Sequence, residues 1–128
     1  MFAQVVKRTN DFARHHGIYP YVLAAWAGLI LVLSVTPGVA GDLNSGYLSH
    51  VCAYFVLTLM LVLSMRKGHR TCICVQALFY AGLYGLFIEC LQYFIPYRAF
   101  EITDIVVNVT AAVAAAVLGH HMIRRQLI

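Results

Sequence analysis

Four long stretches without a charged side chain constrain this sequence more than any other feature. They cover residues 17–41, 43–65, 71–88 and 105–123. Each approaches the roughly 20 apolar residues that an α-helix needs to cross the hydrocarbon core of a bilayer. The composition agrees, because 62% hydrophobic and 11% charged residues lie far outside the balance of a soluble domain. The sequence therefore predicts an all-α, polytopic membrane protein.

The predicted architecture is an antiparallel four-helix bundle. The linkers over residues 66–70 and 96–101 are short, so consecutive helices must be antiparallel neighbours. We expect a short N-terminal segment over residues 1–19 and a membrane domain over residues 20–128. The predicted spans are about 21–35, 48–65, 71–95 and 102–123.

Charge predicts the orientation, because Lys and Arg in short loops are retained on the cytoplasmic side. Eight of the nine basic residues lie beside one end of the spans, and only Arg98 lies beside the other. We therefore expect a multi-pass protein of the cytoplasmic membrane, with both termini in the cytoplasm and the loops over 37–47 and 96–101 outside. A cleaved signal peptide is the competing interpretation of the first span, but its apolar run is long for one.

The N-terminal segment places apolar residues on one face of a helix and polar, mostly basic residues on the other, which is typical of a helix lying in the membrane interface. A flexible tail is the alternative. The sequence pI is about 9.0, but the basic residues adjoin the spans, where anionic lipid headgroups are the nearer partner. We therefore expect membrane lipids as partners and no nucleic acid.

Polar side chains form two layers near the predicted outer end of the last three spans. At a rise of 1.5 Å per residue, the deeper layer lies about 9 Å below that end. The shallower layer comes three or four residues away on the same helix faces. The deeper layer contains Tyr54, Glu89 and Asn108, and the shallower layer contains His50, Gln92 and Asp104. Below them the third span continues with Gly85 and Gly82, and the fourth with Ala111, Ala112, Ala115 and Gly119.

The energetic cost of burying charge predicts that these stripes face one another. A carboxylate facing lipid near the bilayer centre costs on the order of 3 kcal/mol, so ionisable residues in spans usually face the interior or a wet cavity. Once inside, Glu89 needs partners. We expect it to pair with Arg98 or His50. Taken singly, each residue of the set has a structural interpretation as a hydrogen bond between helices.

These residues resemble the VanZ-like family, which is named for a teicoplanin-resistance protein. The resemblance covers about residues 30–122 and depends on "SHVCAYF", on "YGLFIECLQYFIPYRAFEITDIVVN" and on the Ala-rich helix that follows. It implies a small multi-span membrane protein of the cell envelope, with some members linked to glycopeptide tolerance. The family usually has an Asp-Lys pair just before the His, where this chain has Gly46 and Tyr47, so the role of that pair is not carried over.

The predicted function is an outward-facing pocket that binds, and in one version modifies, an anionic envelope lipid or a lipid-linked glycan. Glu89 and His50 are the candidate catalytic residues, as general base or acid and proton partner. The candidate ligand-binding residues are Arg98, Asp104, Asn108, Gln92 and Tyr54. The sequence does not decide whether the protein is an enzyme.

Two alternatives remain open. In the first, the protein is a noncatalytic membrane accessory whose polar cluster is structural, with a second copy or an envelope protein as its partner. In the second, His50, Glu89 and Asp104 hold a divalent metal ion. Because their spacing across three spans matches no metal-binding signature, we predict neither a metal nor another cofactor.

Overall fold

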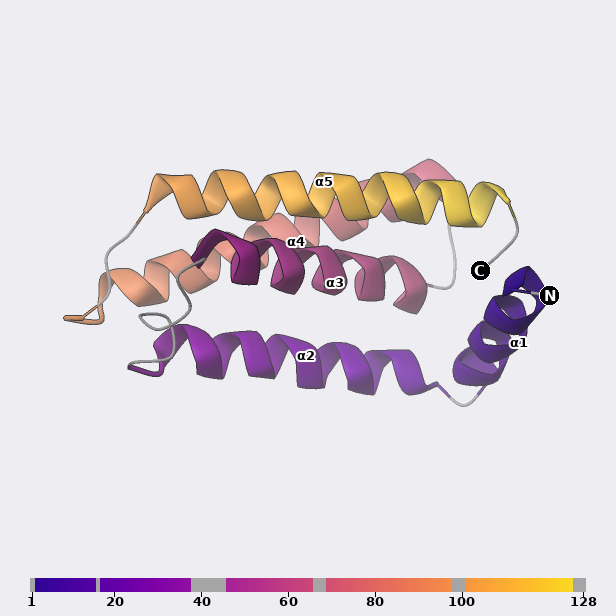
Figure 1. Ribbon diagram of the computed structural model, residues 1–128, viewed down its shortest axis with the longest axis horizontal. Coiled ribbons are helices and arrows are strands. Elements are labelled where there is room, and N and C mark those ends of the chain that lie inside the picture. Colours follow the sequence, from indigo (N-terminus) through magenta and orange to yellow (C-terminus); the bar gives the residue numbers. More distant parts are fainter. Residues whose placement is uncertain (1, 16, 38–45, 66–68, 98–100, 126–128) are drawn as a thin grey trace.

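The computed structural model describes residues 2–15, 17–37, 46–65, 69–97 and 101–125 and is a bundle of long antiparallel helices with one short helix at its end (Figure 1). No strand occurs among these residues. Four of the helices are long and apolar enough to cross a membrane, which confirms the predicted all-α, four-span fold. The helices are α1 (Phe2–His15), α2 (Ile18–Val35), α3 (Gly46–Ser64), α4 (Arg70–Tyr93) and α5 (Ile102–Arg124).

Helix α1 lies at the same end of the bundle as the C-terminal end of α5 (Figure 1). It is strongly amphipathic, unlike the four long helices. Gly17, between α1 and α2, has a φ of 63°, in the left-handed region that glycine adopts without a steric penalty. The chain therefore turns sharply between α1 and the first long helix.

Several helix boundaries differ from those expected by one to three residues, and two of the differences have a clear physical reason. Helix α2 begins at Ile18, so Pro20 lies inside its first turn and not before the span. Proline is tolerated there because the first N–H groups of a helix have no partner within the helix. Helix α4 ends at Tyr93 and not at residue 95, because its last turn tightens, with the Ile95 amide donating to the Gln92 carbonyl over 3.0 Å.

Small residues let α5 pack closely against α3. Ala111, Ala112 and Ala115 are buried on α5, and a Cβ added to Gly119 would lie 3.0 Å from Val62 Cγ1. The predicted stripe of small residues is therefore used inside the bundle. In membranes such stripes allow two helix backbones to approach each other.

Only one of the two glycines of the α4 stripe packs closely against another helix. A Cβ at Gly85 would lie 3.2 Å from the ring of Tyr54, whereas nothing lies within 4 Å of a Cβ at Gly82. The expected stripe therefore does not give a close helix contact at Gly82, because no described atom lies within 4 Å of a Cβ at that position.

Helix α2 packs less extensively than the other long helices, and Ile30 is its buried residue. Four hydrogen bonds join α2 to neighbouring segments, and in each one a side chain donates to a backbone carbonyl. A helix carbonyl can accept such a bond because its oxygen has two lone pairs. The pairs are Trp26 Nε1 to Ala53 O (3.0 Å), Tyr84 OH to Ala27 O (2.6 Å), Gln92 Nε2 to Ser34 O (3.3 Å) and Tyr97 OH to Val35 O (2.6 Å).

Candidate functional site

Glu89 is fully buried inside the bundle, with 0% of its surface exposed. It lies four residues before the end of α4, about 6 Å along the helix axis. Neither of its carboxylate oxygens has a hydrogen-bond partner among the described residues. The backbone N–H of Glu101 approaches the carboxylate without completing a hydrogen bond. Such a group is costly, because burial removes its hydration without replacing it.

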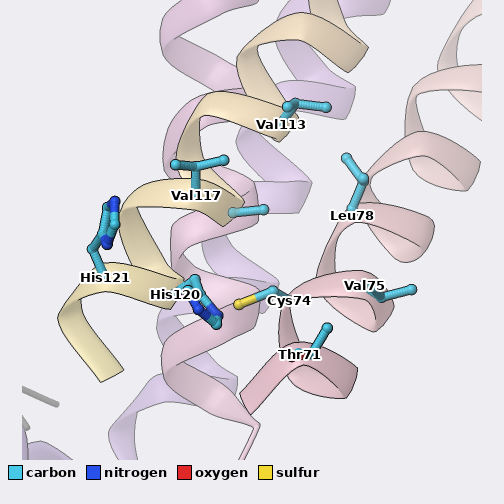
Figure 2. A pocket seen from close by; sticks show the side chains of 9 residues that line it. Thr71, Cys74, Val75, Leu78, Val113, Val117, His120 and His121 are labelled. Atoms are coloured by element: carbon cyan, nitrogen blue, oxygen red, sulfur yellow. The ribbon is translucent and has the colours of Figure 1, made fainter. Parts of the chain in front are cut away.

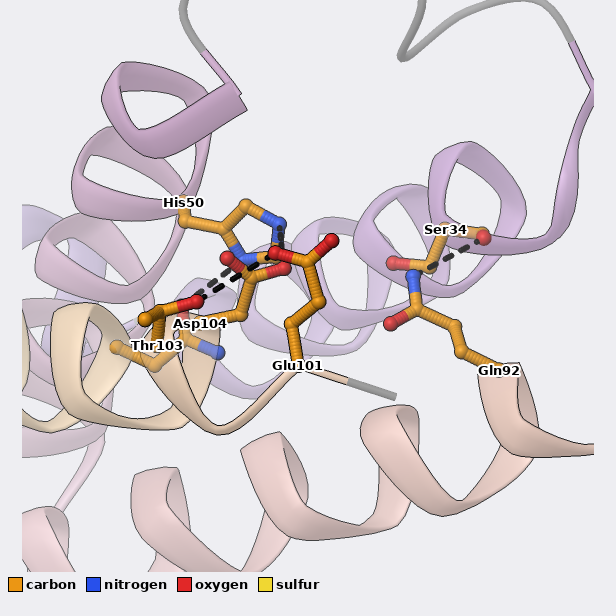
Figure 3. A network of polar contacts seen from close by, with 7 residues as sticks. Ser34, His50, Gln92, Glu101, Thr103 and Asp104 are labelled. Atoms are coloured by element: carbon orange, nitrogen blue, oxygen red, sulfur yellow. Dashed lines mark hydrogen bonds and ion pairs between the residues drawn. The ribbon is translucent and has the colours of Figure 1, made fainter. Parts of the chain in front are cut away.

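His50 links α3 to α5 just above Glu89. Its Nδ1 lies 3.0 Å from Asn108 Oδ1, and its Nε2 lies 3.5 Å from Asp104 Oδ2. Figure 3 shows the imidazole facing Asp104 from the opposite helix. The His50 and Asp104 side chains each keep 20% of their surface exposed. The site is therefore covered by two partly accessible groups, with a fully buried carboxylate beneath them.

Three titratable groups from three helices meet at this level. One ligand atom each from His50, Glu89 and Asp104 lies within 4.8 Å of the others. Glu89 was expected to pair with Arg98 or His50; it lies close to His50 but accepts no hydrogen bond from it, because the two His50 nitrogens face Asn108 and Asp104. The other expected partner, Arg98, lies outside the described residues.

Tyr54 completes the wall of the cluster on α3. Its ring is almost fully buried and lies parallel to the His50 ring, with centroids 6.4 Å apart. Its hydroxyl has no hydrogen-bond partner among the described residues. We use "polar cluster" below for His50, Tyr54, Glu89, Asp104 and Asn108.

Gln92 does not share this arrangement. Its amide nitrogen donates to the Ser34 carbonyl of α2 (Figure 3), so the side chain reaches the first span. Gln92 could be identified from the sequence as a polar residue of the span, but its partner could not. The acceptor is the backbone carbonyl of Ser34, and a backbone group leaves no signal in the sequence.

An open apolar groove of about 240 Å³ lies between α4 and α5 near the opposite end of the bundle (Figure 2). His120 is half-buried and lines it together with the exposed His121. The groove offers no carboxylate, so its chemistry differs from that of the polar cluster. Its lining residues are Thr71, Cys74, Val75, Leu78, Val113, Ala116, Val117, His120 and His121.

The residues of the polar cluster fall within a match to a known family. The family model described as VanZ/LLP1 matches residues 20–124, which include all four long helices except the first two residues of α2. The chain belongs to the VanZ/LLP1 family. Comparisons with curated proteins and with solved structures gave no match.

Within this VanZ/LLP1 chain, the residues that carried the resemblance divide into two groups. His50, Glu89, Asp104 and Asn108 meet at one point of the bundle, whereas Gln92 joins α2 to α4. Asp42 and Asn44, which lie near the position of the family's usual Asp-Lys pair, are outside the described residues.

Proposed function

We propose that the polar cluster is an outward-facing site in the cytoplasmic membrane that binds the headgroup of an anionic envelope lipid or of a lipid-linked glycan. Glu89 supports this most directly, since it is fully buried and both oxygens lack a partner in the described part of the chain. A purely structural carboxylate would be hydrogen-bonded, because leaving one unpaired costs at least about 1–3 kcal/mol. Its free lone pairs suit the hydroxyls of a sugar or glycerol headgroup, which are donors.

The orientation supports a site on the outer surface. The positively charged residues gather beside the opposite end of the spans, which is the end retained in the cytoplasm. Both termini are then cytoplasmic, and the polar cluster lies at the level where the headgroups of the outer leaflet begin. An envelope lipid could reach it there through the partly exposed side chains of His50 and Asp104.

An anionic headgroup also needs positive charge. Glu89 and Asp104 would repel a phosphate if His50 were the only cation near them. Arg98, two residues after Pro96, is the candidate from the sequence, since a guanidinium binds phosphate in a bidentate manner. In this proposal the carboxylates bind headgroup hydroxyls, and the cation binds the phosphate.

The polar cluster is proposed first as a binding site, and a reaction at the bound headgroup would be a second step. The polar cluster contains no serine, threonine or cysteine that could act as a nucleophile. If the headgroup is modified, Glu89 is the candidate general base or acid, and His50 is the candidate proton partner on the other side of the bound headgroup. Through such binding the protein would alter the tolerance of the envelope to glycopeptides, as the family resemblance implies.

A noncatalytic accessory role is the second candidate, and one observation favours it. His50 bridges Asp104 and Asn108 across two helices, as an interhelical structural contact would. In this case the polar cluster fixes the bundle, and the protein acts through a second copy or an envelope protein.

Native mass spectrometry of the gently extracted protein tests the proposal. We expect wild type to carry an anionic lipid or lipid-linked glycan, and we expect Glu89→Gln, which is nearly isosteric, to lower its bound fraction about tenfold. Charge-assisted hydrogen bonds are roughly twice as strong as neutral ones, and a tenfold loss corresponds to about 1.4 kcal/mol. Glu101→Gln is the matched control, because Glu101 is an exposed carboxylate at the same end, and it should keep the lipid.

The accessory role predicts a different result. Glu89→Gln would then leave the lipid content unchanged, provided that circular dichroism and gel filtration show a folded protein. Equal occupancy in wild type and the folded Glu89→Gln variant would contradict the proposed site.

A further inference from the structure

The most unusual feature of the polar cluster is that its acceptors face one another. With Asn108 Oδ1 as the acceptor in their 3.0 Å contact, the tautomer of His50 that fits is the one with the proton on Nδ1. In the neutral imidazole Nε2 then has a lone pair, and it faces Asp104 Oδ2 at 3.5 Å. Glu89 adds a carboxylate whose oxygens have no hydrogen-bond partner among the described residues. Three lone-pair donors that converge in this way suit a cation bound between them.

We propose that His50, Glu89 and Asp104 together bind one divalent metal ion of the Mn²⁺ or Zn²⁺ class. One atom from each residue lies within 4.8 Å of the other two. This reverses the expectation from the sequence that no metal is bound. The inference rests on the proposed function for its biological purpose, since the ion would supply the positive charge that an anionic headgroup needs.

The geometry fits a metal site with a small adjustment. Metal–ligand bonds of about 2.1 Å place tetrahedral ligands about 3.4 Å apart, and His50 Nε2 and Asp104 Oδ2 are already 3.5 Å apart. Only Glu89 has to move closer, and its side chain has three torsions for that movement.

The chemistry of the three ligands indicates the class of metal. Imidazole suits zinc and other transition metals, and carboxylates suit manganese, magnesium and calcium. One His and two carboxylates therefore favour Mn²⁺ or Zn²⁺ over Ca²⁺. Two carboxylates also neutralise a divalent ion, so the filled site carries no net charge into the membrane.

Two further observations match a metal site. Asn108 holds the distal nitrogen of His50, as outer partners of metal-binding histidines do to fix the tautomer and the ring. Three protein ligands leave at least one coordination position open, as in catalytic zinc sites. A headgroup phosphate oxygen or a water could occupy it.

Equilibrium dialysis of the full-length protein in detergent against Mn²⁺ tests the inference. We expect one Mn²⁺ per chain in wild type, at least about tenfold weaker binding in Glu89→Gln and in Asp104→Asn, and unchanged binding in Glu101→Gln. Asp104→Asn is the second variant because Asp104 is partly exposed at the start of α5 and its replacement threatens folding less. His120→Gln with His121→Gln should leave binding unchanged, which excludes the groove at the opposite end.

Two results would overturn the metal site. One is wild-type protein that binds no Mn²⁺ or Zn²⁺ at millimolar concentration, and the other is stoichiometric binding that survives both Glu89→Gln and Asp104→Asn. Native mass spectrometry of the same protein separates this failure from that of the lipid site. Wild-type protein that carries lipid but takes up no added metal overturns the metal site and leaves the headgroup site intact, whereas metal binding without any lipid overturns the headgroup site alone.

Discussion

Gly85 and Gly82 show, at the scale of single residues, how one helix uses glycine in two ways. Gly85 is buried against the ring of Tyr54, whereas Gly82 has open space beside it. The Tyr54 ring in turn lies parallel to that of His50. Gly85 therefore sets the position of two members of the polar cluster without contributing a polar atom.

Gly85→Ala should destabilise the protein, and Gly82→Ala should not. The added methyl group would lie 3.2 Å from a fully packed ring, and overpacking of a well-packed core costs about 1–3 kcal/mol. Because a shift of a few tenths of an ångström relieves the contact, we expect about 1 kcal/mol. Reversible unfolding in mixed SDS micelles measures the difference. Equal stability of the two variants would contradict the close contact with Tyr54.

The position of the polar residues could be predicted from the sequence, but their pairing could not. Burial cost and helical spacing predicted that Glu89 faces inward at the level of Tyr54 and Asn108, and the structure places all three in the interior. Partner choice depends on side-chain length and on the rotation of each helix, which spacing alone does not fix. His50 consequently pairs with Asp104 and Asn108, while Gln92 pairs with α2.

At the scale of elements, α2 and α5 are held in the bundle by different means. Helix α5 packs through small residues against α3 and α4. Helix α2 buries few side chains. Four side-chain hydrogen bonds hold it instead: Trp26 donates to a carbonyl of α3, and Tyr84, Gln92 and Tyr97 donate to carbonyls of α2. The small residues of α5 form a stripe that the sequence displays. The docking of α2 depends on single Trp, Tyr and Gln side chains, whose carbonyl acceptors carry no sequence signal.

The close contact of α3 and α5 predicts an efficient disulfide between cysteines at positions 62 and 119. A Cβ at Gly119 lies 3.4 Å from Val62 Cβ, near the 3.5–4.5 Å range of disulfides. We expect Val62→Cys with Gly119→Cys to oxidise almost completely in membranes when the four native cysteines, which are free, are replaced by alanine. Mass-tagged maleimide added after denaturation counts the remaining thiols.

Val62→Cys with Val117→Cys is the control for this pair. Val117 is exposed and lies about 200° around α5 from Gly119, so its thiol should stay reduced. Equal oxidation of both pairs would mean that α5 is rotated or mobile against α3.

At the scale of the whole molecule, the two ends of the bundle differ in chemistry. One end carries the polar cluster with its buried carboxylate, and the other carries α1 and the basic C-terminal end of α5. The overall fold could be predicted because the length of each apolar stretch and the uneven distribution of basic residues can be read directly from the sequence. The apolar groove beside His120 could not, since it depends on how the side chains of α4 and α5 pack together.

A direct test of the account is the distance between the Glu89 carboxylate and the His50 ring in lipid bilayers. Glu89 and Glu101 are the only glutamates in the sequence, so protein carrying Glu101→Gln and labelled with ¹³Cδ-glutamate and ¹⁵N-histidine gives a single carboxylate signal. Solid-state NMR dipolar recoupling should detect a nearby histidine nitrogen, because one ligand atom of each side chain lies within 4.8 Å of the other. The coupling should disappear in His50→Gln. A Glu89 signal without any coupling to histidine would contradict the meeting of these helices at a common polar cluster.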